Sequence, residues 1–417
     1  MQTSGLDQNT FRTVVPNGLT VLTERVPTVR SAAVGIWVRS ASVHESRVQM
    51  GVSHLLEHMV FKGTERRTAQ EIALALEARG GSLDAYTSRD TTTYQARVLD
   101  AELPRAVDVL TDLVRRPTLR EGDLELERNV ILEEINTVED TPDDQVFDLS
   151  AQALWPEHPY GYRILGTKDS VSALSTGDLR GLHGRAYVPQ NCVVAAAGNL
   201  EHQALLDLLE RHGWLEDVAA GDLPAAPPVP AAGRGVTAKV AKDTAQAHIV
   251  FATDTVPFPD PRKYAIMLLA NVFGGGMSSR LFQRIREELG LAYAVYAFTT
   301  LYHRAGVVGV YVGTQPKTAQ AAADAITEEY GKLAREGLTG AALAEAKQQT
   351  QGQLMLSLES PLSRMYRLAA GAVYGEAYQT LDEVLARVAS ISADDVAAAA
   401  AEFFAPERQT IVWLGPS

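Results

Sequence analysis

The stretch VSHLLEHMVF, residues 52–61, places two histidines and a glutamate in an apolar run without glycine or proline. Such a run predicts a helix. In a helix His54 and His58, at positions i and i+4, point the same way one turn apart, and Glu57 borders the same face. Neutral imidazole is the commonest zinc ligand, and H-x-x-E-H is the inverse of the usual zinc-protease motif. Two histidines satisfied within a core are the alternative, but they would explain neither the ligand spacing nor the carboxylate.

The chain has 417 residues, enough for two or more domains, and its hydrophobic content of 46% is ordinary for a globular protein. The net charge of -13 disfavours nucleic acid and anionic membranes as partners. The single cysteine, Cys192, lies in a strand-like run and is interpreted as a small buried hydrophobe. Because the sequence shows no disulfide pair, no signal peptide and no run of about 18 apolar residues, we expect a cytoplasmic protein without a membrane span.

A proline- and alanine-rich segment, residues 218–235, divides the sequence into two parts, because its prolines exclude a helix interior or a central strand. We predict a zinc-binding domain over residues 1–217, a linker over 218–235 and a related domain over 236–417. An internal repeat supports the division, since its matches are all separated by 217 positions. The matched pairs are Ser175 and Ser392, Asp178 and Asp395, Tyr187 and Phe404, Pro189 and Pro406, and Gly198 and Gly415.

Strands and helices are interspersed in both parts, which predicts an α+β fold of two homologous sandwich-like domains, each a mostly antiparallel sheet packed with helices. Residues 82–88 and 91–98 are expected to pair as a hairpin or an edge strand. The other expected strands are residues 20–26, 32–38, 247–253, 293–300 and 306–312. The expected helices are residues 101–116, 121–138 and 262–272, with alanine-rich helices continuing to Phe404.

The second part has no histidine-rich helix. When Val60-Phe61 is aligned with Val272-Phe273, the motif positions are occupied by Ile266, Leu269 and Ala270. Only the first part is therefore predicted to hold metal.

A catalytic zinc ion needs a third protein ligand and one open position. The other seven histidines form no second pair at ligand spacing. The better candidate is the amphipathic segment 124–140, where Glu127 and Glu134 lie two helical turns apart on one side. The residues alone leave open whether this helix supplies a ligand or is simply a solvated acidic surface.

The sequence resembles the pitrilysin/insulinase family of zinc metallopeptidases over essentially its whole length, and within it the branch of the mitochondrial processing peptidase β subunit and its bacterial relatives. The matching motifs are HLLEHMVFKGT (54–64), AYTSRDTTTY (85–94), ERNVILEEI (127–135), HPYG (158–161) and RIREELGLAY (284–293). The resemblance implies that each such chain forms half of a clamshell. It also implies a ligand about 76 residues after the second histidine, which is Glu134, supported by Glu127, with Glu133 as the fallback.

By this resemblance, zinc held by His54, His58 and Glu134 lowers the pKa of a bound water, and Glu57 acts as general base. Glu127 orients a ligand from outside the metal's coordination sphere. Arg286 and Tyr293 match an Arg-x6-Tyr pair with which the family's second half holds the substrate backbone. Neither half is then expected to be active alone.

The resemblance also assigns substrate contacts. Residues 82–88 correspond to an edge strand that takes the substrate as an added β-strand, so Asp84 and Ala85 are expected to bind substrate. The family usually has Asn at the position of Asp84, and the amide donor is lost here.

Two further segments correspond to substrate-binding features of the processing peptidase. Asp144 and Asp148 match acidic residues that accept a substrate arginine, which predicts a preference for basic residues near the cleaved bond. Gly274, Gly275 and Gly276 match a glycine-rich loop near the substrate entrance; a flexible turn is the alternative, and the lysine of a phosphate-binding loop is missing.

The leading hypothesis is a zinc endopeptidase for unfolded peptides or presequence-like segments. Since the chain matches one half of the clamshell, we expect a homodimer or a heterodimer with a related subunit. The alternatives are a non-catalytic structural or partner subunit, and a metal-dependent hydrolase with another substrate; intact motif residues disfavour the first.

Overall fold

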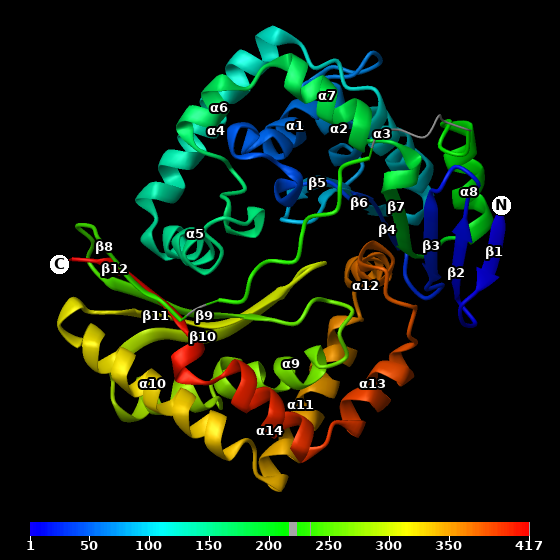
Figure 1. Cartoon of the computed structure of the whole chain (residues 1–417). Coiled ribbons are helices and arrows are strands. Elements are labelled where there is room, and N and C mark those ends of the chain that lie inside the picture. Colours follow the sequence, from blue (N-terminus) through cyan, green and yellow to red (C-terminus); the bar gives the residue numbers. More distant parts are fainter. Residues whose placement is uncertain (217–222, 234, 417) are drawn as a thin grey trace. The chain divides into compact units, whose positions relative to one another are not determined.

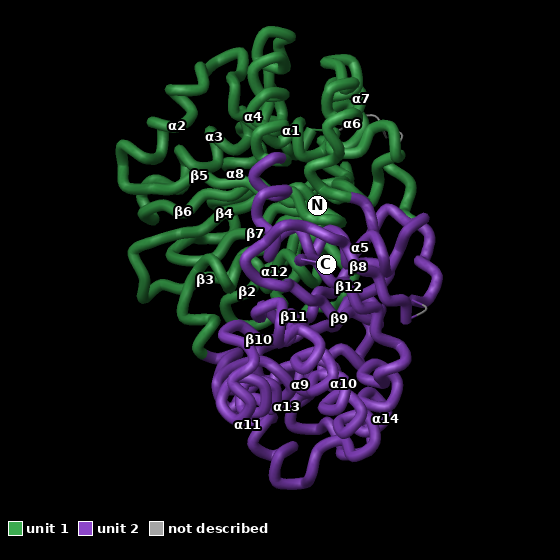
Figure 2. Tube along the Cα trace, turned by 90° about the vertical axis from the view of Figure 1, so that its left-hand side faces the viewer, with its two compact units in different colours: residues 1–135, 163–227, 356–378 green, residues 136–162, 228–355, 379–417 purple. Residues whose placement is uncertain are grey.

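The computed structural model describes residues 1–216, 223–233 and 235–416 (Figure 1). Residues 218–222 and 234 of the predicted linker lie outside the described residues. The chain forms two compact units (Figure 2). Unit 1 consists of Met1–Ile135, Arg163–Pro227 and Leu356–Tyr378, and unit 2 of Asn136–Tyr162, Pro228–Met355 and Gln379–Ser417. Each unit thus takes one short segment from the other half of the sequence, an exchange that the contiguous division predicted from the sequence does not show.

Unit 1 contains a seven-stranded sheet with the order β1-β2-β3-β7-β4-β6-β5. Strands β3 and β7 run parallel, and all other neighbours are antiparallel. The predicted hairpin is confirmed, because β5 pairs with β6 and forms the edge of the sheet. In sheet order the strands are β1 (Gln2–Gly5), β2 (Thr10–Val14), β3 (Thr20–Arg25), β7 (Cys192–Gly198), β4 (Ser31–Val38), β6 (Thr92–Leu99) and β5 (Ser82–Thr87).

The central strands of unit 1 are buried on both faces, which explains their nearly continuous apolar sequence. In β4, Val34 and Ile36 pack into the main core of the unit, whereas Ala33 and Trp37 pack into a second core on the opposite face. Strand β1 shows the contrary case, since all four of its residues are exposed. It is held to β2 by backbone pairing, so it carries no apolar pattern from which it could have been predicted.

Unit 2 contains a five-stranded sheet with the order β10-β11-β9-β12-β8. Only β12 and β8 are parallel, so the order and directions match those of β5-β6-β4-β7-β3 in unit 1. The mostly antiparallel α+β fold is therefore present twice. In sheet order the strands are β10 (Ala292–Leu301), β11 (Gly306–Thr314), β9 (Ala247–Thr255), β12 (Thr410–Gly415) and β8 (Thr237–Ala241).

The internal repeat appears as equivalent elements at the same spacing of 217 residues. Helix α7 (Thr176–Ala186) leads to β7, and helix α14 (Ala393–Phe403) leads to β12. Both helices begin with the same reciprocal cap, in which a serine hydroxyl accepts from the backbone N–H of an aspartate whose carboxylate accepts from the serine N–H. The caps are formed by Ser175 with Asp178 and by Ser392 with Asp395.

The segment exchanged into unit 1 is helix α12 (Pro361–Tyr374), which covers the second face of the sheet. Met365 and Leu368 belong there to the same hydrophobic core as Trp37. Arg39 donates a hydrogen bond to the carbonyl of Ala372 over 3.0 Å, near the end of the helix. An ion pair between Arg364 and Glu24 adds a polar attachment near its start.

The segment exchanged into unit 2 contains helix α5 (Pro142–Leu154), which packs against β9 and β12. The Phe147 ring lies 5.7 Å from that of Tyr311 and 5.2 Å from that of Phe298. Lys242 also donates to the Gln145 side chain over 2.7 Å. Each sheet is thus covered on one face by a helix from the other half of the sequence.

The remaining helices pack on the sheets and on one another. Those of unit 1 are α1 (Val52–Val60), α2 (Ala69–Glu77), α3 (Leu103–Arg115), α4 (Glu121–Asp140, whose end belongs to unit 2), α6 (Lys168–Ala173) and α8 (His202–Arg211). Those of unit 2 are α9 (Lys263–Gly274), α10 (Ala319–Glu336), α11 (Gly340–Ser357, whose end belongs to unit 1) and α13 (Leu381–Ser390). No helix among the described residues is long and apolar enough to cross a membrane.

Candidate metal centre

Helix α1 carries the H-x-x-E-H motif and is anchored at its first turn by a buried carboxylate. Gly51 precedes the helix with φ of 92°, a conformation that favours glycine. The two carboxylate oxygens of Glu45 accept hydrogen bonds from the backbone N–H groups of Gly51 and Ser53, each over 2.8 Å. Because Glu45 satisfies donors that the helix itself cannot pair, it holds the turn from which His54 projects.

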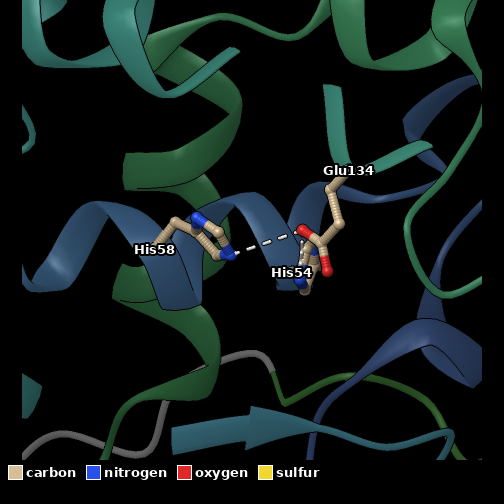
Figure 3. A group of neighbouring side chains, drawn as sticks. All are labelled: His54, His58 and Glu134. Carbon is tan, nitrogen blue, oxygen red and sulfur yellow. Dashed lines mark ion pairs between the residues drawn. The ribbon is translucent and has the colours of Figure 1, made fainter. Parts of the chain in front are cut away.

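His54, His58 and Glu134 converge within unit 1 (Figure 3). Their potential ligand atoms lie within 4.8 Å of one another. Glu134 Oε2 is 3.6 Å from His54 Nε2 and 3.8 Å from His58 Nε2. Zinc–ligand bonds of about 2.0–2.2 Å in a tetrahedron place ligand atoms roughly 3.3–3.6 Å apart. Two imidazole nitrogens and one carboxylate oxygen at these distances fit a zinc ion.

The cluster has a buried side and an open side. The His54 side chain is 9% exposed and that of Glu134 is 41% exposed. Burial, with a smaller contribution from His58, lowers the pKa of His54 to about 3. This imidazole is therefore neutral at pH 7, the form that binds metal. The exposed side around Glu134 leaves room for the fourth position that a catalytic zinc ion keeps open.

Glu127 lies two turns before Glu134 on helix α4, as the sequence spacing predicted, and it contacts the second histidine. Its Oε2 accepts a hydrogen bond from His58 Nδ1 over 3.1 Å, which leaves Nε2 of that ring free to bind metal. Glu127 is buried, and its other oxygen is 2.5 Å from the ammonium nitrogen of Lys62. Lys62 was not selected from the sequence, since nothing in its spacing marks it as a partner of a residue 65 positions away.

Glu57 projects from α1 into a buried environment. Burial raises the pKa of its carboxyl group, and this rise is opposed by a hydrogen bond from Thr87 and by the nearby His58. Thr87 Oγ1 donates to Glu57 Oε2 over 2.6 Å. Thr87 lies in the predicted edge strand, but no sequence pattern indicates that its hydroxyl contacts the motif glutamate.

The remaining predicted residues of unit 1 lie on the edge strand β5. Asp84 is exposed and Ala85 is half-buried, as expected from the alternation of side chains along a strand. Ala85 packs against the main core of the unit, so Asp84 points to the opposite face of the sheet.

Arg286 and Tyr293 both belong to unit 2, and the structure brings them together. The guanidinium of Arg286 lies 4.3 Å from the centre of the Tyr293 ring, and its Nη1 donates to the Tyr293 carbonyl over 3.1 Å. Arg286 is part of a short π-helix, Phe282–Glu288. Asp144 and Asp148 lie one turn apart on helix α5, also in unit 2.

The three glycines at 274–276 do not form one loop, which corrects the sequence-based expectation for Gly274. This residue is the buried last residue of helix α9. A Cβ atom there would lie 2.3 Å from the backbone nitrogen of Ala297, so close packing excludes a side chain. A Cβ on Gly275 would lie 2.1 Å from Asn271 Oδ1, whereas one on Gly276 would meet no atom within 4 Å. The lack of space for a side chain thus accounts for Gly274, which lies against Ala297, and for Gly275, which lies against Asn271.

Comparison with known protein families identifies the family to which the chain belongs. The model of the insulinase family (peptidase family M16) matches residues 20–168, and the model described as the peptidase M16 inactive domain matches residues 173–350. A Streptomyces coelicolor protein named an uncharacterized zinc protease is 38% identical over 415 residues, covering 97% of this chain and 89% of the relative. A Bacillus subtilis protein with the same description is 37% identical over 401 residues, covering 96% and 97%.

Solved structures share the whole fold. A Helicobacter pylori protease has a TM-score of 0.92 at 23% identity, covering 98% of this chain and 99% of that one. A Pseudomonas fluorescens structure described as a peptidase M16 inactive domain has a TM-score of 0.91 at 20% identity, covering 98% of each chain. The chain therefore belongs to the insulinase family of peptidases, family M16, and is a zinc metalloprotease.

Proposed function

We propose that the protein is a zinc endopeptidase that hydrolyses unfolded peptides at the cluster of His54, His58 and Glu134. The observation that carries this proposal is the convergence of the three ligand atoms within 4.8 Å, next to the buried carboxylate of Glu57. Three protein ligands with one exposed side are what a catalytic zinc site requires.

The roles of the side chains follow from their contacts. When bound, zinc supplies a water whose pKa is lowered toward about 7 and polarises the substrate carbonyl. Glu57 accepts a proton from the attacking water and later delivers it to the leaving amine. Glu127 holds His58 through Nδ1, and Lys62 balances the charge of Glu127.

The edge strand β5 is proposed to receive the substrate in extended form. Among the described strands of unit 1 it pairs only with β6, so its outer edge offers backbone donors and acceptors. Asp84 and Ala85 would border the added strand. The Asp84 side chain offers acceptor oxygens to the peptide but lacks the amide donor of asparagine.

The assignments in unit 2 are supported by the family motifs and by local geometry. Arg286 and Tyr293 contact each other, and both would bind the substrate backbone. Asp144 and Asp148 are proposed to favour presequence-like peptides with a basic residue near the cleaved bond. Of the three glycines, only Gly276 is still proposed to lie at the substrate entrance, because a Cβ atom there would meet no atom within 4 Å. A second chain, identical or related, would supply the other half of the clamshell.

The test compares the wild type with Glu57→Gln, with zinc per chain measured on both. The matched control is Glu125→Gln, which makes the same change at an exposed position of helix α4. Wild type and control are expected to cleave an unstructured fluorogenic peptide containing arginine, and Glu57→Gln is expected to lose activity while keeping zinc. Replacing the peptide arginine by alanine should lower turnover.

Equal cleavage by Glu57→Gln and the wild type would contradict the role of Glu57. Equal turnover of the two peptides would remove the basic preference alone. A zinc-loaded wild type that cleaves no peptide would point to a missing second chain, whereas a wild type that binds no zinc would favour a non-catalytic partner subunit.

A further inference from the structure

The carboxylate of Glu57 is held by a hydroxyl group from another element of the same unit. Thr87 Oγ1 donates to Glu57 Oε2 over 2.6 Å. Glu57 is only 8% exposed, so water cannot replace this contact freely. A short bond from a hydroxyl to a buried carboxylate is among the stronger hydrogen bonds in proteins, and losing it leaves the acceptor desolvated.

The position of Thr87 in the sheet decides where its hydroxyl points. Thr87 is the last residue of β5, and the side chains of this strand alternate between the two faces of the sheet. Leu83 and Ala85 pack against the core that includes helix α1, and Thr87 lies on the same face. Tyr86 lies on the other face, where its ring is 6.2 Å from that of Tyr366. A shift of register by one residue would turn Thr87 away from Glu57.

Threonine is well suited to this position. Its β-branched side chain has restricted rotation about χ1, so its hydroxyl samples few directions relative to the strand. The position of the Glu57 carboxylate is therefore tied to the position of the edge strand and not only to helix α1.

We propose that Thr87 is a positioning residue for Glu57 and that it links peptide binding on β5 to the alignment of the general base. The inference rests on the proposed function. A peptide added to the free edge of β5 would restrain the strand up to Thr87 and would thereby fix Glu57 where it accepts the proton of water. Pairing with β5 then raises the turnover rate and not only the affinity.

The test uses two variants that separate the hydroxyl from the shape of the side chain. Thr87→Val keeps the shape and removes the donor, whereas Thr87→Ser keeps the donor and removes the methyl group. We expect Thr87→Val to lower kcat about tenfold, as the loss of one hydrogen bond implies, with KM within about twofold and zinc content unchanged. Thr87→Ser is expected to recover most of kcat.

The control is Thr327→Val, which makes the same chemical change in unit 2. The Thr327 hydroxyl donates to the carbonyl of Ala323 in its own helix α10, so the control should keep wild-type kinetics. The proposal is overturned if Thr87→Val has wild-type kcat, if it loses zinc, or if only KM rises. It is also overturned if Thr87→Ser is as impaired as Thr87→Val, since the role would then be one of packing.

A peptide series in which successive backbone amides are N-methylated tests the link to β5. Methylation of an amide that pairs with the strand should lower kcat in the wild type and should have a smaller relative effect on kcat in Thr87→Val. Equal relative losses in both proteins would show that strand pairing and base alignment are independent.

Crystal structures of the zinc-loaded wild type and both variants provide a readout that needs no activity. The Glu57 carboxylate is expected in one position in the wild type and in Thr87→Ser, and in a shifted or second position in Thr87→Val. If the wild type alone cleaves no peptide, this comparison still decides the role of Thr87, independently of the proposed function. An unmoved Glu57 in Thr87→Val would overturn it.

Discussion

The two halves of the chain build the same sheet topology, but only one half carries catalytic groups on the corresponding helix. Helix α1 presents His54, Glu57 and His58. In helix α9 the aligned positions are Ile266, Leu269 and Ala270, all of them buried in the core of unit 2. The shared topology places an equivalent helix in each unit. The comparison teaches that a few residues on one face of this helix decide whether the face forms a metal site or part of a hydrophobic core.

This difference has an energetic side. An apolar side chain at such a position stabilises the fold by burial, whereas a buried carboxylate or imidazole costs free energy unless it is paired. In unit 1 the cost is offset by bonds from Thr87 to Glu57 and from His58 to Glu127. The helix α9 face needs no such partners, because it carries no ionisable group at these three positions.

The largest expected effect concerns metal content, which should depend on one half only. Glu134→Gln replaces a charged ligand with a neutral side chain. Mutating a residue that only supports a ligand lowers metal affinity or activity by roughly 10–100-fold, and we expect zinc affinity and peptidase activity to fall by more than this in Glu134→Gln. Glu133→Gln is the matched control on the neighbouring residue and should keep both. Zinc per chain after dialysis and kcat are the measurements. Equal zinc loss in the two variants would favour Glu133 as a ligand.

The second prediction tests whether the face of helix α9 that corresponds to the motif face of α1 belongs to the hydrophobic core. Leu269 is fully buried, so Leu269→Glu should lower the free energy of unfolding by about 3–5 kcal/mol. The control Leu74→Glu makes the same change at a leucine of helix α2 that is 50% exposed, and should change it by less than about 1 kcal/mol. Urea unfolding measures both. Similar values for the two variants would mean that the aligned face of α9 is not a core surface.

The third effect concerns the anchor of helix α1. Burial raises the pKa of Glu45 to about 7, although two backbone N–H groups oppose the rise. Because the folded protein binds this proton more tightly than the unfolded chain, the contribution to stability is full below pH 4.5 and is lost as the pH rises through about 7.

The corresponding variant is Glu45→Gln, which cannot release a proton and should remove this dependence. A change on the order of 1–3 kcal/mol across that pH window is expected. Urea unfolding at several pH values between 4.5 and 8 would measure it on the metal-free protein, with Glu125→Gln as control. Parallel pH profiles for wild type and Glu45→Gln would contradict the prediction.

A smaller effect compares the two copies of the repeat directly. Ser175→Ala and Ser392→Ala each remove the cap of an equivalent helix, α7 or α14. Each should lower the free energy of unfolding of its unit by about 1 kcal/mol, and the two values should agree within about 0.5 kcal/mol. Thermal unfolding of both variants checks this. A difference of more than 2 kcal/mol would show that the two caps have diverged in their surroundings.

The smallest effect is expected from cutting the chain between the halves. A protease site introduced between Ala225 and Ala226 leaves helix α5 with the first fragment and helix α12 with the second, so each fragment completes the unit of the other. The cut fragments should elute together in size-exclusion chromatography, with nearly unchanged thermal stability. Met365→Asp, which buries a charge between α12 and the unit 1 sheet, should weaken this association. Fragments that separate without that change would contradict the role of the exchanged helices.

The sequence by itself determined the features that depend on local periodicity. Backbone geometry places residues i and i+4 on one helix face, so the spacing of His54 and His58 defined half of the cluster. The spacing of Glu127 and Glu134 placed both glutamates on one side of α4, and family resemblance selected Glu134. The constant spacing of 217 residues revealed the repeat, and β-propensity located the β5–β6 hairpin.

The tertiary structure decided the contacts between residues that are far apart in the chain. The bond from Thr87 to Glu57, the ion pair of Lys62 with Glu127 and the exchange of α5 and α12 have no local signal, because they depend on how the sheet packs against its helices. A polar edge strand such as β1 has no apolar pattern that would predict it, since its pairing with β2 uses backbone groups and a few polar side chains. Periodicity therefore fixes which residues share a face, and only packing decides what that face meets.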